Sequence, residues 1–236
     1  MTKMRMTRLT LIAAALTAMA GAAEESVAGG VDRDGAAPVQ QPGFVEVGSR
    51  RVARTASARI PVIDVFWYSC PHCFALESEV LKWQAQQRRD VEFSRLPAVW
   101  DEPTRSDAQL FYTIRHLGRD DLHQAIYDEI HVHGNSLKAR TAGETLTMRV
   151  MFAKEHGIPA ERFTRTYESA AVRLDVERAR QLSERWKLTR TPAFVVDDDF
   201  ETDPARVGAL ARLLPQVDQL VARARASRHP GAQVDQ

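Results

Sequence analysis

The only two cysteines of this 236-residue chain stand three positions apart, in the tetrapeptide Cys70-Pro71-His72-Cys73. A disulfide between them closes a very short loop, so by chain entropy it contributes about 2 kcal/mol, against roughly 3 kcal/mol for a 15-residue loop. Such a bridge does little to stabilise a domain of ordinary size. The same two residues make a suitable redox pair, and the spacing therefore predicts a thiol–disulfide exchange centre.

The residues around the cysteines predict separate roles for them. Pro71 is in position to open a helix, which places Cys70 at the helix N-terminus, where unpaired N–H groups and the helix dipole favour a thiolate. His72 can add a hydrogen bond or a positive charge. Cys73 lies one turn later and should point inward. We therefore expect Cys70 to be the exchanging cysteine and Cys73 to close the internal bridge.

Two other interpretations of the cysteine pair remain open at this point. A zinc half-site would need a second pair of ligands, and only scattered histidines such as His131 and His133 are available. An inert structural bridge is the second alternative. Redox chemistry explains the spacing better than either.

The elements that must position the cysteines follow from hydrophobic periodicity. Residues 60–68 are nearly continuously apolar, as in a strand covered on both faces. A helix over 74–87 and a strand over 91–96 complete a strand–helix–strand unit. Residues 104–187 carry helical periodicity throughout, residues 193–196 form a buried strand, and a last helix is expected over 204–226. This order predicts an α/β sheet domain with a helical insertion.

The ends of the chain differ in composition from this domain. Lys3, Arg5 and Arg8 precede an apolar run over residues 9–20 and an Ala18-Met19-Ala20 cleavage pattern, so residues 1–23 are predicted to be a signal peptide rather than a retained anchor helix. Residues 24–43 are predicted to be a flexible linker and 229–236 a disordered tail. The net charge of +1 gives no reason to expect a nucleic-acid partner.

Two stretches carry a family resemblance. Phe66-Trp67-Tyr68-Ser69-Cys70-Pro71-His72-Cys73 resembles the active site of the DsbA family of bacterial periplasmic disulfide oxidases, and Thr191-Pro192 resembles the cis-proline loop of the thioredoxin superfamily. The resemblance covers residues 44–226. It implies a thioredoxin fold in two parts, residues 44–103 and 188–228, around an inserted all-helical domain over 104–187. Asp197-Asp198-Asp199 departs from the Gly- or Asn-containing turn usual in the family and is read as a turn rather than a metal site.

The resemblance also implies a function and further site residues. The chain would donate its disulfide to newly exported, unfolded, cysteine-containing proteins in the periplasm, and a membrane reoxidant of the DsbB type would restore it. The chain itself would hold no metal and no organic cofactor. Thr191 and Pro192 would bind substrate. Asp64, six positions before Cys70, would tune the site as the proton acceptor of Cys73, or form a structural ion pair with Arg95; the two roles are compatible.

Rival functions are a disulfide isomerase or reductase, and a binding or chaperone module that uses the thioredoxin fold for recognition alone. Isomerases need an N-terminal dimerisation module, for which residues 24–43 are too short and too polar, and nothing in the sequence demands a dimer. The remaining conspicuous side chains have structural interpretations. The aromatic residues Phe66, Trp67, Phe111 and Trp186 are expected in the core, and the histidines His116, His123, His131, His133 and His156 in solvent.

Overall fold

The computed structural model describes residues 43–47 and 59–228. The predicted signal peptide, the linker up to residue 42 and the C-terminal tail lie outside the described residues. The described part contains a five-stranded sheet in the order β1-β5-β4-β2-β3, with β2 and β3 parallel and the other pairs antiparallel. The strands are β1 (Val45–Glu46), β2 (Ile60–Phe66), β3 (Val91–Pro97), β4 (Ala193–Val196) and β5 (Phe200–Thr202).

Helices follow the predicted order, with one correction. They are α1 (Pro71–Gln86), α2 (Glu102–His116), α3 (Leu122–His131), α4 (Ala142–Glu155), α5 (Ala160–Tyr167), α6 (Ala170–Arg185), α7 (Pro204–Val207), the 3-10 turn η1 (Leu210–Arg212) and α8 (Leu213–Arg228). The prediction of a single last helix over 204–226 was wrong. The Asp203 side chain caps α7, and Gly208 ends it with a φ of 80°, a left-handed conformation that glycine adopts readily.

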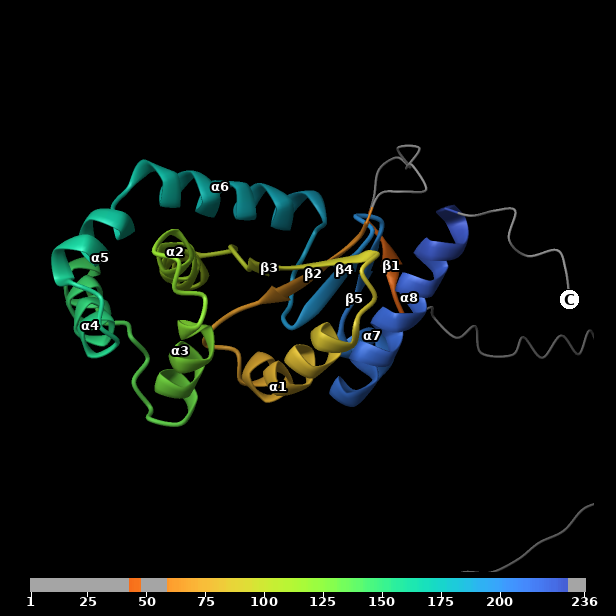
Figure 1. Ribbon diagram of the computed structural model, residues 1–236, viewed down its shortest axis with the longest axis horizontal. Helices are drawn as coiled ribbons and strands as arrows, with labels where there is room; N and C mark the ends of the chain where they lie inside the picture. Colours follow the sequence, from red (N-terminus) through yellow and green to blue (C-terminus); the bar gives the residue numbers. More distant parts are fainter. Residues whose placement is uncertain (1–42, 48–58, 229–236) are drawn as a thin grey trace, which may run out of the picture. The chain divides into compact units, whose positions relative to one another are not determined.

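Helices cover the sheet on both faces (Figure 1). On one face, α1 and α8 bury a core with alternate residues of β2 and β4, among them Val62, Phe194 and Val196. On the other face, α2 and α6 pack against Val65 and Val195. A third core joins the helical insertion to the C-terminal end of β2, and it includes Phe66, Tyr68 and both cysteines. The α/β architecture with a helical insertion is therefore confirmed, and the cysteines lie where insertion and sheet meet.

The central strand β2 places a charged pair beside the cysteines. It pairs with β3 so that Asp64 lies opposite Arg95, and with β4 so that Asp64 lies opposite Phe194. Because strand side chains alternate between faces, Asp64 shares the α1 face of the sheet with Ile60, Val62 and Phe66. Sheet register thus brings Asp64 and Arg95 together beneath the active-site helix.

The acidic run Asp197-Asp198-Asp199 forms the tight connection between β4 and β5. Asp197 and Asp198 have φ values of 59° and 56°, and the Asp199 N–H donates to the Val196 carbonyl at 3.1 Å. Two successive positive φ angles are typical of a two-residue hairpin turn, in which aspartate is tolerated better than most residues. The Asp197 carboxylate pairs with Arg228 of α8. The prediction of a turn here is confirmed.

Arg149 of α4 is buried completely inside the helical insertion. Its guanidinium donates to the carbonyls of Leu137 and Ser106 at 3.1 and 2.7 Å, to the Tyr167 hydroxyl at 2.9 Å, and to Asp107 at 3.2 Å. One cation therefore joins α2, the loop before α4, α4 itself and α5. Leu137 has a φ of 52°, so this side chain also secures a loop residue in an unfavourable backbone conformation.

Candidate active site

Cys70 occupies the N-cap of α1, and Pro71 is the first helical residue, as predicted. No side chain caps this end, and the first turn carries no acidic residue. The helix N-terminus therefore directs its unpaired N–H groups at the Cys70 sulfur without competition from a carboxylate. Both thiols are unbridged in this structure, so the geometry is that of the dithiol form.

The surroundings of Cys70 favour its thiolate. A hydrogen bond with the Cys73 thiol is the largest cause that lowers the pKa of Cys70, to about 5 from an ordinary value of 9.0. Burial opposes this effect, and hydrogen bonds from the Thr191 side chain and from the backbone of Cys73 and His72 add to it. Cys70 is thus ionised at neutral pH.

Cys73 is the opposite case. It is only 4% exposed, and burial, followed by its interaction with Cys70, raises its pKa well above the ordinary value. The negative charge of Asp64 raises the pKa further. Two cysteines three positions apart at the first turn of one helix therefore differ strongly in acidity, which is the arrangement expected of an exchanging and a resolving thiol.

This difference predicts how redox state and pH together control stability. With a Cys70 pKa of about 5 in the fold and 9.0 when unfolded, the thiolate stabilises the reduced form by roughly 3 kcal/mol at pH 7. The stabilisation is complete above pH 9 and is lost as pH falls through 5. Urea unfolding of the reduced and oxidised forms from pH 4 to 8 measures it. A pH-independent difference between the two forms would contradict it.

The Thr191–Pro192 peptide bond is cis, as the family resemblance implies, and it lies directly before β4. The Cys70 sulfur lies 3.5 Å from the Thr191 carbonyl oxygen, to which it donates when it is protonated. Thr191 and Pro192 therefore stand against the exchanging sulfur, although they are more than a hundred positions away in sequence. Their role in binding substrate remains a prediction.

Asp64 forms the predicted interaction with Arg95, in a larger cluster than expected. Arg95 Nε lies 3.8 Å from Asp64, and Arg95 Nη2 donates to Glu77 of α1 at 2.6 Å. Both carboxylates are only 3% exposed. Burial is the main cause that raises the pKa of Asp64, to about 7, with Arg95 opposing and Glu77 adding to the effect. A carboxyl group that titrates near neutrality beneath Cys73 is suited to accept and return its proton.

The histidines differ in burial, and one of those expected in solvent is buried. His72 is exposed, and its imidazole makes no hydrogen bond in the described part of the chain. His131 Nε2 donates to the Tyr68 carbonyl at 2.8 Å, and the ring stacks on Phe74. His123 is only 7% exposed, so its placement in solvent was wrong. Helical periodicity placed it on a mixed face, but a second element, the Phe66–Tyr68 segment, covers that face.

The sequence analysis did not identify Glu77, His123 or Lys138 as residues close to the cysteines. It also did not identify Arg95 as a partner of two carboxylates. Each lies on an element remote in sequence from at least one of its partners, so no local pattern marks it. The available signal for Glu77 is its spacing of four from Cys73, which places the two side chains on one face of α1.

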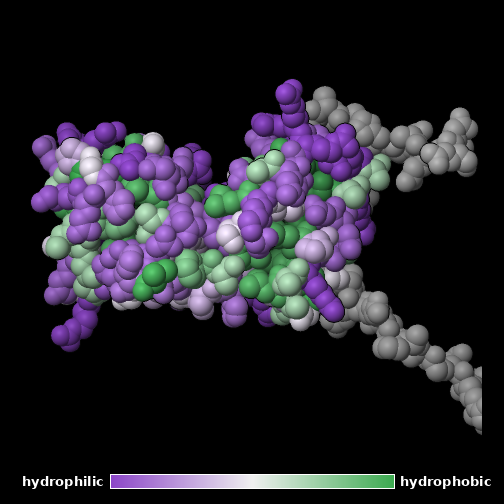
Figure 2. All heavy atoms as spheres, turned by 60° about the horizontal axis from the view of Figure 1, so that its bottom comes forward, coloured by the Kyte–Doolittle hydropathy of each residue, from purple (hydrophilic) through white to green (hydrophobic). Residues whose placement is uncertain are grey.

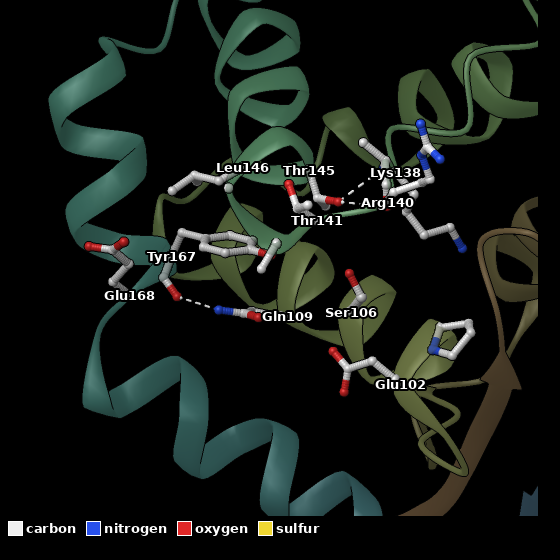
Figure 3. A pocket seen from close by; sticks show the side chains of 14 residues that line it. Glu102, Ser106, Gln109, Lys138, Arg140, Thr141, Thr145, Leu146, Tyr167 and Glu168 are labelled. Carbon is white, nitrogen blue, oxygen red and sulfur yellow. Dashed lines mark hydrogen bonds between the residues drawn. The ribbon is translucent and has the colours of Figure 1, made fainter.

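A polar groove of about 580 Å³ lies in the helical insertion close to this site (Figure 3). Lys138 lines it and donates to Ser69, the residue before Cys70, at 2.8 Å, and to Asp107 at 2.9 Å. Gln109 crosses the floor to the Tyr167 carbonyl. Neither cysteine nor Thr191 or Pro192 lines this groove, so it is distinct from the redox site.

Two findings concern the described residues alone. Within residues 43–47 and 59–228, no three His, Cys, Asp or Glu side chains are grouped to hold a metal ion. None of the helices over these ranges is long and apolar enough to cross a membrane.

Comparison with known proteins gives one consistent family. The chain is 30% identical over 220 residues to the thiol:disulfide interchange protein DsbA of Pseudomonas aeruginosa, covering 92% of this chain and 94% of that protein. It is 33% identical over 169 residues to DsbA of Bordetella parapertussis, covering 71% and 78%. No general protein-family model matches the chain.

Solved structures agree with these relatives. The crystal structure of Pseudomonas aeruginosa DsbA superposes with a TM-score of 0.70 at 29% identity, over 79% of this chain and 94% of that one. DsbA from Xylella fastidiosa gives a TM-score of 0.69 at 26% identity, over 78% and 95%. The fold is thus the thioredoxin fold with a helical insertion. The chain belongs to the DsbA family and is a thiol–disulfide oxidoreductase.

Proposed function

We propose that this protein donates the Cys70–Cys73 disulfide to unfolded, cysteine-containing proteins that have been exported. A substrate thiolate attacks the Cys70 sulfur, the Cys70–Cys73 bond breaks, and Cys73 leaves as a thiolate that takes up a proton from Asp64. A second substrate thiolate then attacks the substrate sulfur of the mixed disulfide and releases the Cys70 thiolate. The substrate gains one disulfide, and the protein becomes a dithiol.

The observation that carries this proposal is the placement of Cys70 at the uncapped N-terminus of α1, within reach of the Cys73 thiol and backbone N–H groups. These contacts stabilise the Cys70 thiolate, which exists only in the reduced protein. Stabilising the reduced form makes the disulfide more easily reduced and therefore a stronger oxidant of other thiols. The direction of exchange follows from that electrostatic preference.

Substrate binding is proposed at Thr191 and Pro192. The cis-proline loop presents the Thr191 carbonyl beside Cys70, where an extended substrate backbone can pair with it. Figure 2 shows the molecule turned so that the lower helices of Figure 1 come forward. On this face, hydrophobic residues gather across the centre, beside a largely hydrophilic helical insertion. An apolar surface on this face suits unfolded chains without a fixed sequence.

The proposal also includes a cellular location for the protein and a partner that restores its disulfide. An N-terminal signal peptide would deliver the protein to the periplasm, an oxidising compartment in which a disulfide donor is useful. A membrane reoxidant of the DsbB type would accept the electrons of the dithiol. The location rests on the N-terminal sequence, and the reoxidant rests on the family. We further propose that the protein acts as a monomer.

The equilibrium with glutathione tests the direction of exchange. Purified mature protein is equilibrated with mixtures of reduced and oxidised glutathione, and the dithiol fraction is measured by thiol trapping. We expect small amounts of reduced glutathione to open the Cys70–Cys73 bond, because the Cys70 thiolate stabilises the product. A bond that stays closed until glutathione is strongly reducing would instead indicate a reductase, and the oxidase proposal would fail.

A further inference from the structure

His123 enters the redox core from the helical insertion. It lies in the first turn of α3 and packs in an aromatic cage formed by Phe66, Tyr68, Phe111 and Tyr127, with ring centroids 5.0 to 6.0 Å from its own. Burial, the largest cause, lowers the pKa of His123, so the imidazole is neutral at pH 7. A neutral polar ring inside an aromatic cage requires hydrogen-bond partners for both nitrogens.

Tyr68 and Glu77 together determine which nitrogen carries the proton. The Tyr68 hydroxyl lies 2.9 Å from His123 Nδ1, and burial holds the pKa of Tyr68 well above its ordinary value, so the phenol keeps its hydrogen. A phenol can donate or accept, whereas the Glu77 carboxylate that faces Nε2 can only accept, so the neutral imidazole carries its hydrogen on Nε2 and accepts from Tyr68 at Nδ1. The tautomer is thus inferred from the hydrogen-bond network.

The Nε2–H group then faces Glu77. His123 Nε2 is buried without a hydrogen-bond partner among the described residues, and it lies 3.7 Å from Glu77 Oε2. That separation is slightly beyond hydrogen-bond distance, and a small movement of either side chain closes it. The other Glu77 oxygen already accepts from Arg95, the residue shared with Asp64. His123 is therefore placed to donate a hydrogen bond to Glu77, whose carboxylate competes with that of Asp64 for the Arg95 guanidinium.

We propose that His123 is a positioning residue for thiol–disulfide exchange: by partnering Glu77 through Nε2, it leaves Arg95 available to Asp64 and so sets the charge balance beneath Cys73. This inference rests on the proposed function and on Asp64 as the proton acceptor of Cys73. It gives the helical insertion a direct part in the chemistry, although both cysteines belong to the strand–helix–strand unit. A small pocket of about 180 Å³, lined by His123, Arg95 and Asp120, opens beside the cluster.

Several charged and titratable groups face His123 from the surrounding elements. They are Tyr68 from the segment after β2, Glu77 from α1, Arg95 from β3, Arg115 of α2 at the pocket, Asp120 before α3, and Tyr127 within α3. Arg95 is the cation placed between the two buried carboxylates. If Glu77 loses its imidazole partner, its charge holds Arg95 more strongly and acts on Asp64 with less compensation. Both effects raise the pH at which Asp64 becomes an effective base.

Two matched substitutions separate the two nitrogens. In His123→Gln the side-chain amide nitrogen can take the place of Nε2 and donate to Glu77. In His123→Asn the shorter amide can meet Tyr68 but cannot reach Glu77. A role in packing alone predicts that both variants behave alike, or that the smaller asparagine is merely less stable. The positioning role predicts that glutamine is close to wild type and asparagine is not.

The readout is the rate at which Cys73 displaces glutathione from a mixed disulfide at Cys70, measured from pH 5 to 9. We expect this rate to rise as Asp64 ionises, with a midpoint near its pKa of about 7. We expect His123→Asn to move the midpoint upward by about one pH unit and to lower the rate at pH 7 severalfold, with His123→Gln near wild type. In an Asp64→Asn background, His123→Asn should have no further effect. Equal midpoints for all three proteins, or additive losses in the double variant, would overturn the proposal.

A second measurement does not depend on exchange. The Asp64 carboxyl is titrated by carbon NMR in the reduced wild type and in both His123 variants, and unfolding curves confirm that each variant is folded. The proposal requires the Asp64 midpoint to rise in His123→Asn alone, and an unchanged midpoint contradicts it. If the wild type itself failed to donate its disulfide in the glutathione test while these shifts were present, the proposed function would fail and the role of His123 would stand.

Discussion

Replacing Cys73 with serine is expected to arrest exchange at the mixed disulfide, whereas replacing Cys70 with serine is expected to prevent the mixed disulfide from forming. The exchanging sulfur must be a thiolate, and Cys70 alone has its pKa lowered, to about 5. With Cys70 retained and Cys73 absent, an activated test disulfide should form an adduct that no internal thiol resolves. Mass spectrometry of the protein after incubation with such a disulfide measures the adduct.

We expect oxidation of a reduced substrate protein to fall by at least about a thousandfold in either variant, since neither can carry the internal disulfide. The serine hydroxyl of each variant is close in size to the thiol, so unfolding midpoints of the reduced proteins serve as the control. A Cys70→Ser variant that still accumulated adduct through Cys73, or that kept full activity in cells, would contradict the assignment. The second result would favour the binding or chaperone alternative.

Replacing Arg149 with methionine is expected to lower the free energy of unfolding by about 3 to 5 kcal/mol. The substitution leaves Asp107 with Lys138 as its cation and removes the donors for the Leu137 and Ser106 carbonyls and the Tyr167 hydroxyl. Buried acceptors without donors are costly, and the loop at Leu137 loses a contact that holds its positive φ. Urea unfolding at pH 7 measures the change.

Arg165→Met is the matched control on the same insertion. The Arg165 side chain is 72% exposed and, among the residues that the structure describes, pairs only with the exposed Glu161, so its loss should change stability by less than about 0.5 kcal/mol. Comparable losses for Arg149→Met and Arg165→Met would show that the buried network contributes no more than a surface ion pair. The redox equilibrium with glutathione should change little in either variant, because neither arginine contacts the thiols.

Much of the active site could be predicted from local sequence, for identifiable physical reasons. The spacing of Cys70 and Cys73, with Pro71 between them, determines that both lie in the first turn of one helix and that the first stands at its N-terminus. A run of apolar residues determines a central strand before it. These features depend on neighbours within a few residues, where hydrogen bonding and helix geometry leave little choice. The acidic turn at Asp197 and Asp198 belongs to the same class.

Only the tertiary structure decided which polar groups meet beneath the thiols. The pairing of Asp64 with Arg95 was anticipated, but the parallel register of β2 and β3 determines it, and nothing local marks Glu77 as the partner of Arg95. His123 has a mixed helical face that is typical of a solvated residue, and it is buried because the Phe66–Tyr68 segment covers it. Burial and long-range pairing depend on which surfaces the folded chain brings together. Sequence alone therefore determined the placement of the two cysteines on their helix, whereas packing between the sheet and the insertion determined the charges that lie beneath them.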